Sequence, residues 1–138
     1  MDYFYGEEND PTSLAAQTAN PSALGLIAFG YTTALLQGAN TTWAEAGNST
    51  NSTTNITYCY ALFFGGLVQL LAGMWEFRRN NMFAATAFSS YGGFWLGYGI
   101  YGVLASGGVI EQSGPRSIEM FLSLWGIFTF LYFIVSLG

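Results

Sequence analysis

Four long stretches of the chain carry almost no charge, and this feature limits most strongly what the chain can fold into. A helix rises about 1.5 Å per residue, so roughly 20 helical residues cross a hydrocarbon core about 30 Å thick. Each stretch has about this length. We therefore predict membrane-spanning helices over residues 21–39, 57–77, 83–104 and 117–137.

The composition agrees with a membrane protein and excludes several classes of function. Charged residues make up 8% of the chain, whereas soluble domains average about 25%. Three arginines and no lysine cannot neutralise a phosphate backbone, so nucleic acid is excluded as a partner. With no histidine and a single cysteine, Cys59, there is no His/Cys metal site, Cys–His nucleophile or internal disulfide. We expect no enzymatic activity, no metal and no cofactor.

The four apolar stretches are predicted as helices rather than strands. None shows the alternation of apolar and polar residues that membrane barrel strands carry over about 10 residues. Helices that are apolar nearly all round suit contact with lipid and with neighbouring helices, so we predict an all-α, polytopic transmembrane fold. The small-residue pairs Gly93/Gly97 and Ala61/Gly65 are either close helix contacts or chance occurrences in a glycine-rich chain.

The first 19 residues differ from the rest and are predicted to form an acidic, flexible tail, which leaves residues 20–138 as the transmembrane domain. This tail has neither the basic start nor the apolar core of a cleaved signal peptide. It holds half of the acidic residues: Asp2, Glu7, Glu8 and Asp10.

The few charges also predict the orientation in the membrane. Arg78 and Arg79 lie in the short linker between the second and third stretches, and cytoplasmic loops favour such residues. The first loop then lies outside. It is rich in Asn, Ser and Thr, and it contains four glycosylation sequons, which are either used, making the chain a glycoprotein, or chance products of this composition. They begin at Asn40, Asn48, Asn51 and Asn55.

Three motifs resemble one known family. They are "NPSALGL" at residues 20–26, "GGLVQLLAGMWEFRRNNMFAATAFSSYGGFWL" at residues 65–96, and "LWGIFTFLYF" in the fourth stretch. They are similar to the acetate uptake transporter family, the succinate/acetate permeases and their fungal and algal relatives. The resemblance implies a six-helix protein that assembles as a homohexamer in a lipid bilayer. It implies passage of acetate and similar monocarboxylates, by proton-coupled transport or as an anion channel. We expect the plasma membrane, with an organelle membrane as the alternative.

The chain departs from that family in ending after the fourth stretch, so two expected helices are missing. We expect a truncated sequence; the alternative is a natural four-helix remnant. The function we favour is a transporter or channel for acetate and related short-chain monocarboxylates. The alternatives are a structural or accessory membrane subunit that transports nothing, and a transporter of another small solute such as ammonium.

The opening motif has a physical interpretation of its own. Asn20 can cap the first helix with its side-chain oxygen, and Pro21 suits the first helical position, where its missing N–H costs nothing. Free N–H groups at a helix start suit a carboxylate. The sequence alone favours an ordinary cap at the membrane surface, whereas the resemblance, in which this motif is a hallmark, favours the carboxylate. By the resemblance, Phe29 matches a residue of the family's central constriction.

In the second stretch, Gln69 and Glu76 are seven residues apart and share a helix face. Polar side chains inside a membrane helix suggest function because exposure to hydrocarbon is costly. Glu76 either carries a coupled proton or pairs with Arg79 or a neighbouring helix. Gln69 either lines the substrate pathway or bonds to another helix.

The third stretch groups hydroxyls and aromatic rings. Tyr91 and Trp95 are four residues apart and share a face, with Ser90 beside them. An aromatic stripe of this kind is usually helix packing, but rings that narrow a pore can form a hydrophobic gate. The resemblance places Tyr91 at the family's constriction, opposite Phe29. The candidate substrate-pathway residues are Asn20, Pro21, Phe29, Gln69, Glu76, Ser90, Tyr91 and Trp95.

Overall fold

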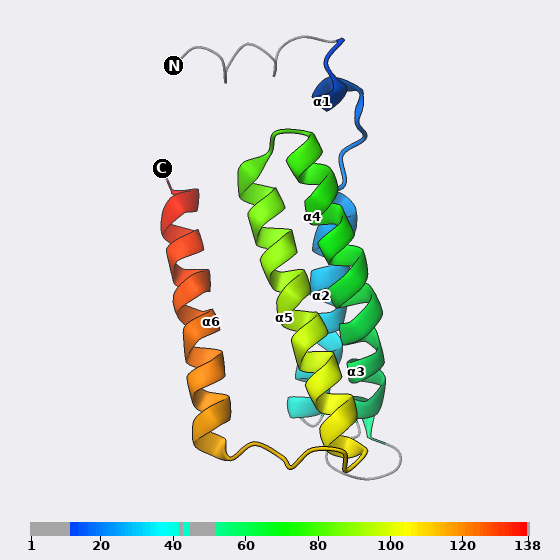
Figure 1. Cartoon of the computed structure of the whole chain (residues 1–138), viewed down its shortest axis with the longest axis vertical. Coiled ribbons are helices and arrows are strands. Elements are labelled where there is room, and N and C mark those ends of the chain that lie inside the picture. Colours follow the sequence, from blue (N-terminus) through cyan, green and yellow to red (C-terminus); the bar gives the residue numbers. More distant parts are fainter. Residues whose placement is uncertain (1–11, 42, 45–51, 138) are drawn as a thin grey trace. The chain divides into compact units, whose positions relative to one another are not determined.

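The computed structural model describes residues 12–41, 43–44 and 52–137, and all regular elements in this part are helices. In order they are α1 (Leu14–Gln17), α2 (Ser22–Asn40), α3 (Thr53–Leu62), the π-helical segment η2 (Phe63–Val68), α4 (Gln69–Arg78), α5 (Met82–Ser106) and α6 (Pro115–Ser136) (Figure 1). The chain divides after Val103 into two compact units, which are described separately.

The long helices fall within a few residues of the predicted stretches. α3, η2 and α4 run on as one helix, Thr53–Arg78, which starts four residues before the predicted span because Ser52 caps it. By length and hydropathy, two helices in the described part could cross a membrane: Thr53–Arg78 and Pro115–Ser136. α2 and α5 contain more glycine and hydroxyl side chains, which lower their hydropathy. Their role as spans therefore stays a prediction.

The segment predicted as an acidic tail is described only in its second half. Residues 1–11 lie outside the described residues. From there on the chain forms the single helical turn α1, which begins where the Ser13 hydroxyl accepts a hydrogen bond from the backbone N–H of Ala16 at 3.1 Å.

Within the first unit, α4 and α5 approach each other through glycine. A Cβ on Gly92 would lie 2.8 Å from the backbone nitrogen of Leu70, a distance that real Cβ atoms essentially never show, and 3.0 Å from the carbonyl oxygen of Gly66, which is also tight. The buried residues of α5 recur at alternating steps of three and four, as in a coiled-coil seam. They are Ala85, Phe88, Gly92, Trp95, Gly99 and Gly102.

The predicted small-residue pairs differ in outcome. Ala61 and Gly65 are buried, and a Cβ on Gly65 would lie 2.7 Å from the Thr32 hydroxyl of α2. Gly93 and Gly97 are exposed, and no described atom comes within 4 Å of where their Cβ atoms would be. Within the first unit, helix α5 turns Gly92 and Gly99, rather than Gly93 and Gly97, toward α3–α4, so a contact role for Gly93 and Gly97 stays a prediction.

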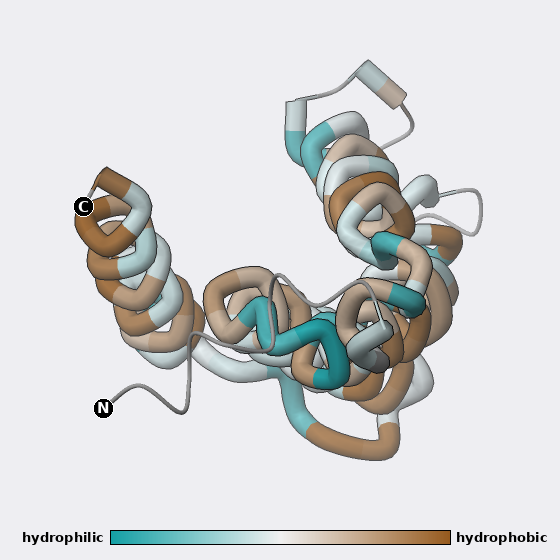
Figure 2. The backbone as a smooth tube through the Cα atoms, turned by 90° about the horizontal axis from the view of Figure 1, so that it is seen from above, coloured by the Kyte–Doolittle hydropathy of each residue, from teal (hydrophilic) through white to brown (hydrophobic). Residues whose placement is uncertain are grey.

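The second unit contains α6, which begins at Pro115 after an extended Gly114. None of its described residues is buried. Three of its aromatic rings contact one another in sequence, edge to face between Trp125 and Phe128 with centroids 5.4 Å apart, and tilted between Phe128 and Tyr132 with centroids 4.9 Å apart. Apolar residues recur along the whole helix (Figure 2).

We predict that Gly92→Ala separates α4 from α5, because its methyl group would meet backbone atoms that cannot move independently. Overpacking of this kind costs about 1–3 kcal/mol. The matched control is Gly93→Ala, where the methyl group enters open space and replaces a helical glycine, a change that stabilises helices by roughly 0.5–1 kcal/mol. Thermal unfolding of both variants in the same detergent checks this order. Equal melting temperatures would contradict the close approach.

Candidate functional site

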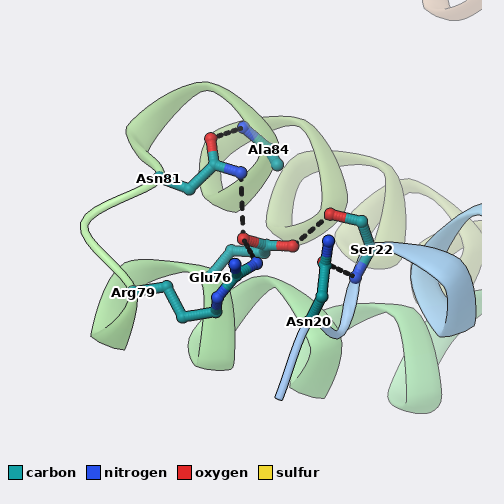
Figure 3. A network of polar contacts seen from close by, with 6 residues as sticks. All are labelled: Asn20, Ser22, Glu76, Arg79, Asn81 and Ala84. Carbon is teal, nitrogen blue, oxygen red and sulfur yellow. Dashed lines mark hydrogen bonds and ion pairs between the residues drawn. The ribbon is translucent and has the colours of Figure 1, made fainter. Parts of the chain in front are cut away.

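Glu76, in the last turn of α4, carries a carboxylate that is 0% exposed. One oxygen accepts a hydrogen bond from the Ser22 hydroxyl of α2. The other accepts one from the Asn81 side-chain amide at 3.0 Å and pairs with the Arg79 guanidinium at 3.5 Å (Figure 3). A buried charge is costly unless it is paired and hydrogen-bonded. Here donors from α2 and from the α4–α5 turn together meet that requirement.

The turn after α4 has a backbone conformation that places the Arg79 and Asn81 side chains beside Glu76. The N–H of Asn81 donates to the Glu76 carbonyl and the N–H of Asn80 to the Phe77 carbonyl, both at 3.0 Å, which is the Schellman arrangement of a helix end. Asn80 has a φ of 62°, in the left-handed region that asparagine tolerates better than most residues. The sequence therefore ends α4 and reverses the chain within three residues.

Asn81 then begins the next helix. Its side-chain oxygen accepts a hydrogen bond from the Ala84 N–H at 3.3 Å, so it caps α5 while its amide nitrogen holds Glu76. One side chain thus fixes both the start of α5 and the carboxylate. Sequence reasoning missed this residue, although an Asn at a helix start was a readable signal.

The opening motif behaves as a cap, one residue later than predicted. The side-chain oxygen of Asn20 accepts a hydrogen bond from the Ser22 N–H at 2.9 Å, and Pro21 is the cap residue of a helix that starts at Ser22. The carboxylate beside this helix start is Glu76 of the same chain, bound by Ser22. Ser22 was also missed, because its partner lies 54 residues away in the sequence.

The structure brings two other candidates into direct contact. The rings of Phe29 on α2 and Tyr91 on α5 lie 5.1 Å apart between centroids, at 53° to each other. One helical turn earlier on α2, Gly25 leaves room for the Phe88 ring, since a Cβ there would lie 2.9 Å from it. α2 and α5 therefore touch through aromatic rings at successive turns.

The remaining candidates lie in the interior of the same unit. Gln69 is 1% and Trp95 2% exposed, and Ser90 is half-buried. Among the described residues, neither the side-chain oxygen of Gln69 nor the indole nitrogen of Trp95 has a hydrogen-bond partner. The Ser89 hydroxyl is also buried without one, a residue that sequence reasoning did not select. Buried polar atoms are normally paired, so these three mark places for a further polar group.

The other sequence-predicted sites are only partly described. Asn40 ends α2 and Asn55 lies in the first turn of α3, both exposed, whereas Asn48 and Asn51 lie outside the described residues. In the described part of the chain, no three acidic or cysteine side chains gather closely enough to hold a metal ion.

Comparison with known proteins adds to this geometry. Residues 6–137 match the family described as the GPR1/FUN34/yaaH family. The chain belongs to this family. Within it, Acetate permease A of Emericella nidulans is 42% identical over 126 residues, covering 88% of this chain and 40% of the permease. Succinate-acetate/proton symporter SatP of Escherichia coli K12 is 34% identical over 119 residues, covering 86% of this chain and 60% of SatP.

A solved structure of the family, reported as the bacterial acetate channel SatP, has the same fold over most of this chain. The TM-score is 0.74 at 34% identity, with 84% of this chain and 60% of that chain covered. The chain thus spans about 40–60% of the length of these family members.

We predict that Glu76→Gln destabilises the helical unit. The change leaves Arg79 without its partner and turns an amide N–H₂ toward Ser22 or Asn81, both of which donate hydrogen bonds to this position. Leaving buried polar groups unsatisfied costs about 1–3 kcal/mol. Ser22→Ala, which removes one donor of three, is expected to cost less. The exposed Glu119 provides the control variant, Glu119→Gln.

The measurement is thermal unfolding of purified protein together with the amount of folded protein recovered from the membrane. Equal stability of Glu76→Gln and Glu119→Gln would show that the buried contacts around Glu76 do not support the fold.

Proposed function

We propose that the chain forms part of a membrane transporter or channel for acetate and related short-chain monocarboxylates. The observation that carries this proposal is its membership of a family in which a curated permease and a solved channel are both described as acetate proteins. The alternative is a structural or accessory membrane subunit that retains these helices without transporting a solute.

The pathway we infer runs beside the Phe29–Tyr91 pair. The contacts of Ser22 with Glu76 and of Thr32 with Gly65 set the antiparallel register of α2 against α3–α4, which puts Phe29 near the height of Gln69. The unpaired oxygen of Gln69 and indole N–H of Trp95 would supply an acceptor and a donor to a small carboxylic acid. Two rings at this height would restrict the passage by size.

For Glu76 we favour the structural role over proton transfer. Three donors already engage its carboxylate, and a proton carrier must release such contacts to exchange its proton. Family members are described both as a proton symporter and as a channel. The test is acetate uptake by Glu76→Gln with and without an inward proton gradient, divided by the amount of assembled protein. If the variant assembles normally but its uptake no longer responds to the gradient, Glu76 carries the coupled proton.

The arrangement in the membrane is also a proposal. We infer four spans of a six-helix fold within residues 20–138, with the Arg78–Arg79 turn in the cytoplasm and the glycosylated first loop outside, in the plasma membrane. A homohexamer would give neighbours to surfaces that lie exposed in the described part, including the backbone at Gly93 and Gly97 and the apolar side chains of α6. Small residues of this kind suit helix contacts in lipid.

We predict that Phe29→Ala combined with Tyr91→Ala relaxes size selectivity, because both rings of the contact are removed. The ratio of acetate to succinate uptake should fall by about tenfold, the scale of discrimination that a small change of pocket volume produces. The measurement is uptake of both labelled acids into vesicles that contain the reconstituted full-length protein.

The control for this prediction is Ile27→Ala, which shortens a side chain on α2 that is 60% exposed. It should leave the uptake ratio unchanged. An unchanged ratio in the double variant of the full-length protein would remove the ring pair from the pathway, and absence of any solute uptake by the unmodified full-length protein would favour the accessory-subunit alternative.

The orientation is tested with single cysteines in a Cys59→Ser background. Met82→Cys lies at the start of α5 beside the arginine turn, and Glu111→Cys lies between α5 and α6; both positions are exposed. A membrane-impermeant maleimide applied to intact cells should label Glu111→Cys and not Met82→Cys, and permeabilised cells should label both. The reverse pattern in intact cells would invert the proposed topology.

A further inference from the structure

A cavity of about 470 Å³ lies beside the α4–α5 turn in the first unit. One wall comes from α1 and the other from the turn itself. The residues that line it are Ala15, Ala16, Arg79, Asn80, Asn81 and Met82. Its volume is within the range of small-molecule pockets, about 300–1,000 Å³, so a small solute would enter together with some of its water.

Arg79 reaches this cavity with unused donors. Its side chain is 25% exposed, and one terminal nitrogen of the guanidinium pairs with Glu76 at 3.5 Å. The Nε–H is buried and has no partner among the described residues. A guanidinium offers five donors, so its second terminal nitrogen can still donate a hydrogen bond to a carboxylate while the first pairs with Glu76.

The other charges around Arg79 leave the cavity positive. Of the described residues that line it, Arg79 alone is ionisable. The Glu76 carboxylate is 0% exposed and accepts hydrogen bonds from Ser22 and Asn81 as well as pairing with Arg79. It is therefore buried between the helices and does not line the cavity. The negative end of α4, which ends at Arg78, and the positive end of α5, which begins at Met82, meet at this wall and oppose each other, so Arg79 supplies the positive charge.

We propose that this cavity is a vestibule that binds a small carboxylate anion on the Arg79 guanidinium. The choice of acetate as the anion rests on the proposed function, whereas the anion site itself rests on the cavity and the unpaired guanidinium donors. The site is separate from the Phe29–Tyr91 contact, which lies two turns further along α2 from Ser22. It would concentrate the anion at one mouth of the pathway.

The test uses the arginine reagent phenylglyoxal on the full chain in lipid vesicles, with modification at each arginine followed by peptide mass spectrometry. Acetate should slow the modification of Arg79 in a saturable way. At ten times the dissociation constant the rate should fall about tenfold, since only the free site reacts. Arg78 and Arg116, which are exposed, serve as internal controls and should be unaffected.

Two variants locate the protection. Ala16→Phe fills the cavity from α1, so Arg79 should react slowly without acetate and acetate should slow it no further. Ala19→Phe places the same ring on an exposed residue outside the cavity and should keep the protection. Protection that persists in Ala16→Phe would overturn the assignment to this cavity.

Protection by other anions and acetate uptake are measured to distinguish the remaining outcomes of the test. Protection by phosphate without protection by acetate would overturn the carboxylate assignment, and no protection of Arg79 by acetate would overturn the vestibule. Acetate uptake is measured on the same vesicles. Uptake without protection removes only the vestibule, whereas saturable protection without uptake supports the vestibule and counts against transport by these helices alone.

Discussion

One buried carboxylate holds together the end of the first helical unit. Glu76 can remain at 0% exposure only because a hydroxyl from α2, an amide from the turn and a guanidinium from its own helix surround it. Removing one partner of a buried ion pair is strongly destabilising, since the other charge is left unsatisfied. The direction of α2, the end of α4 and the start of α5 therefore depend on one side chain.

Further along the helices, glycine residues allow close contacts that fix the positions of α2, α4 and α5 relative to one another. Gly92 brings α5 against the backbone of α4, and Gly25 gives the Phe88 ring its place against α2. Close contacts of backbone with backbone leave little freedom for sliding or rotation. The Phe29–Tyr91 pair and the unpaired Gln69 oxygen consequently sit at defined heights, as a size-selective passage would require.

The sequence predicted the features that depend on local spacing. The lengths of the charge-free stretches predicted the long helices, and the position of Asn20 before Pro21 predicted its role as a cap. The spacing of seven residues predicted that Gln69 and Glu76 share a helix face, and both are buried. It could not predict contacts between distant residues: nothing local links Ser22 to Glu76, or distinguishes the buried Gly92 from the exposed Gly93. Such choices depend on how each helix is rotated against its neighbours.

The helix Thr53–Arg78 contains a π-helical segment of six residues. This segment sets how the half before it is rotated about the helix axis relative to the half after it. The buried positions Thr57, Ala61, Gly65 and Gln69 follow at steps of four, which in a regular α-helix would wind the buried stripe by about 120° around the axis. A π-helical turn holds more residues than an α-helical turn, so each step of four residues comes closer to a full turn and the stripe winds less. The segment therefore keeps the buried positions of the two halves, from Thr57 to Gln69, closer to one side of the helix, and shortening it by one residue would rotate one half relative to the other.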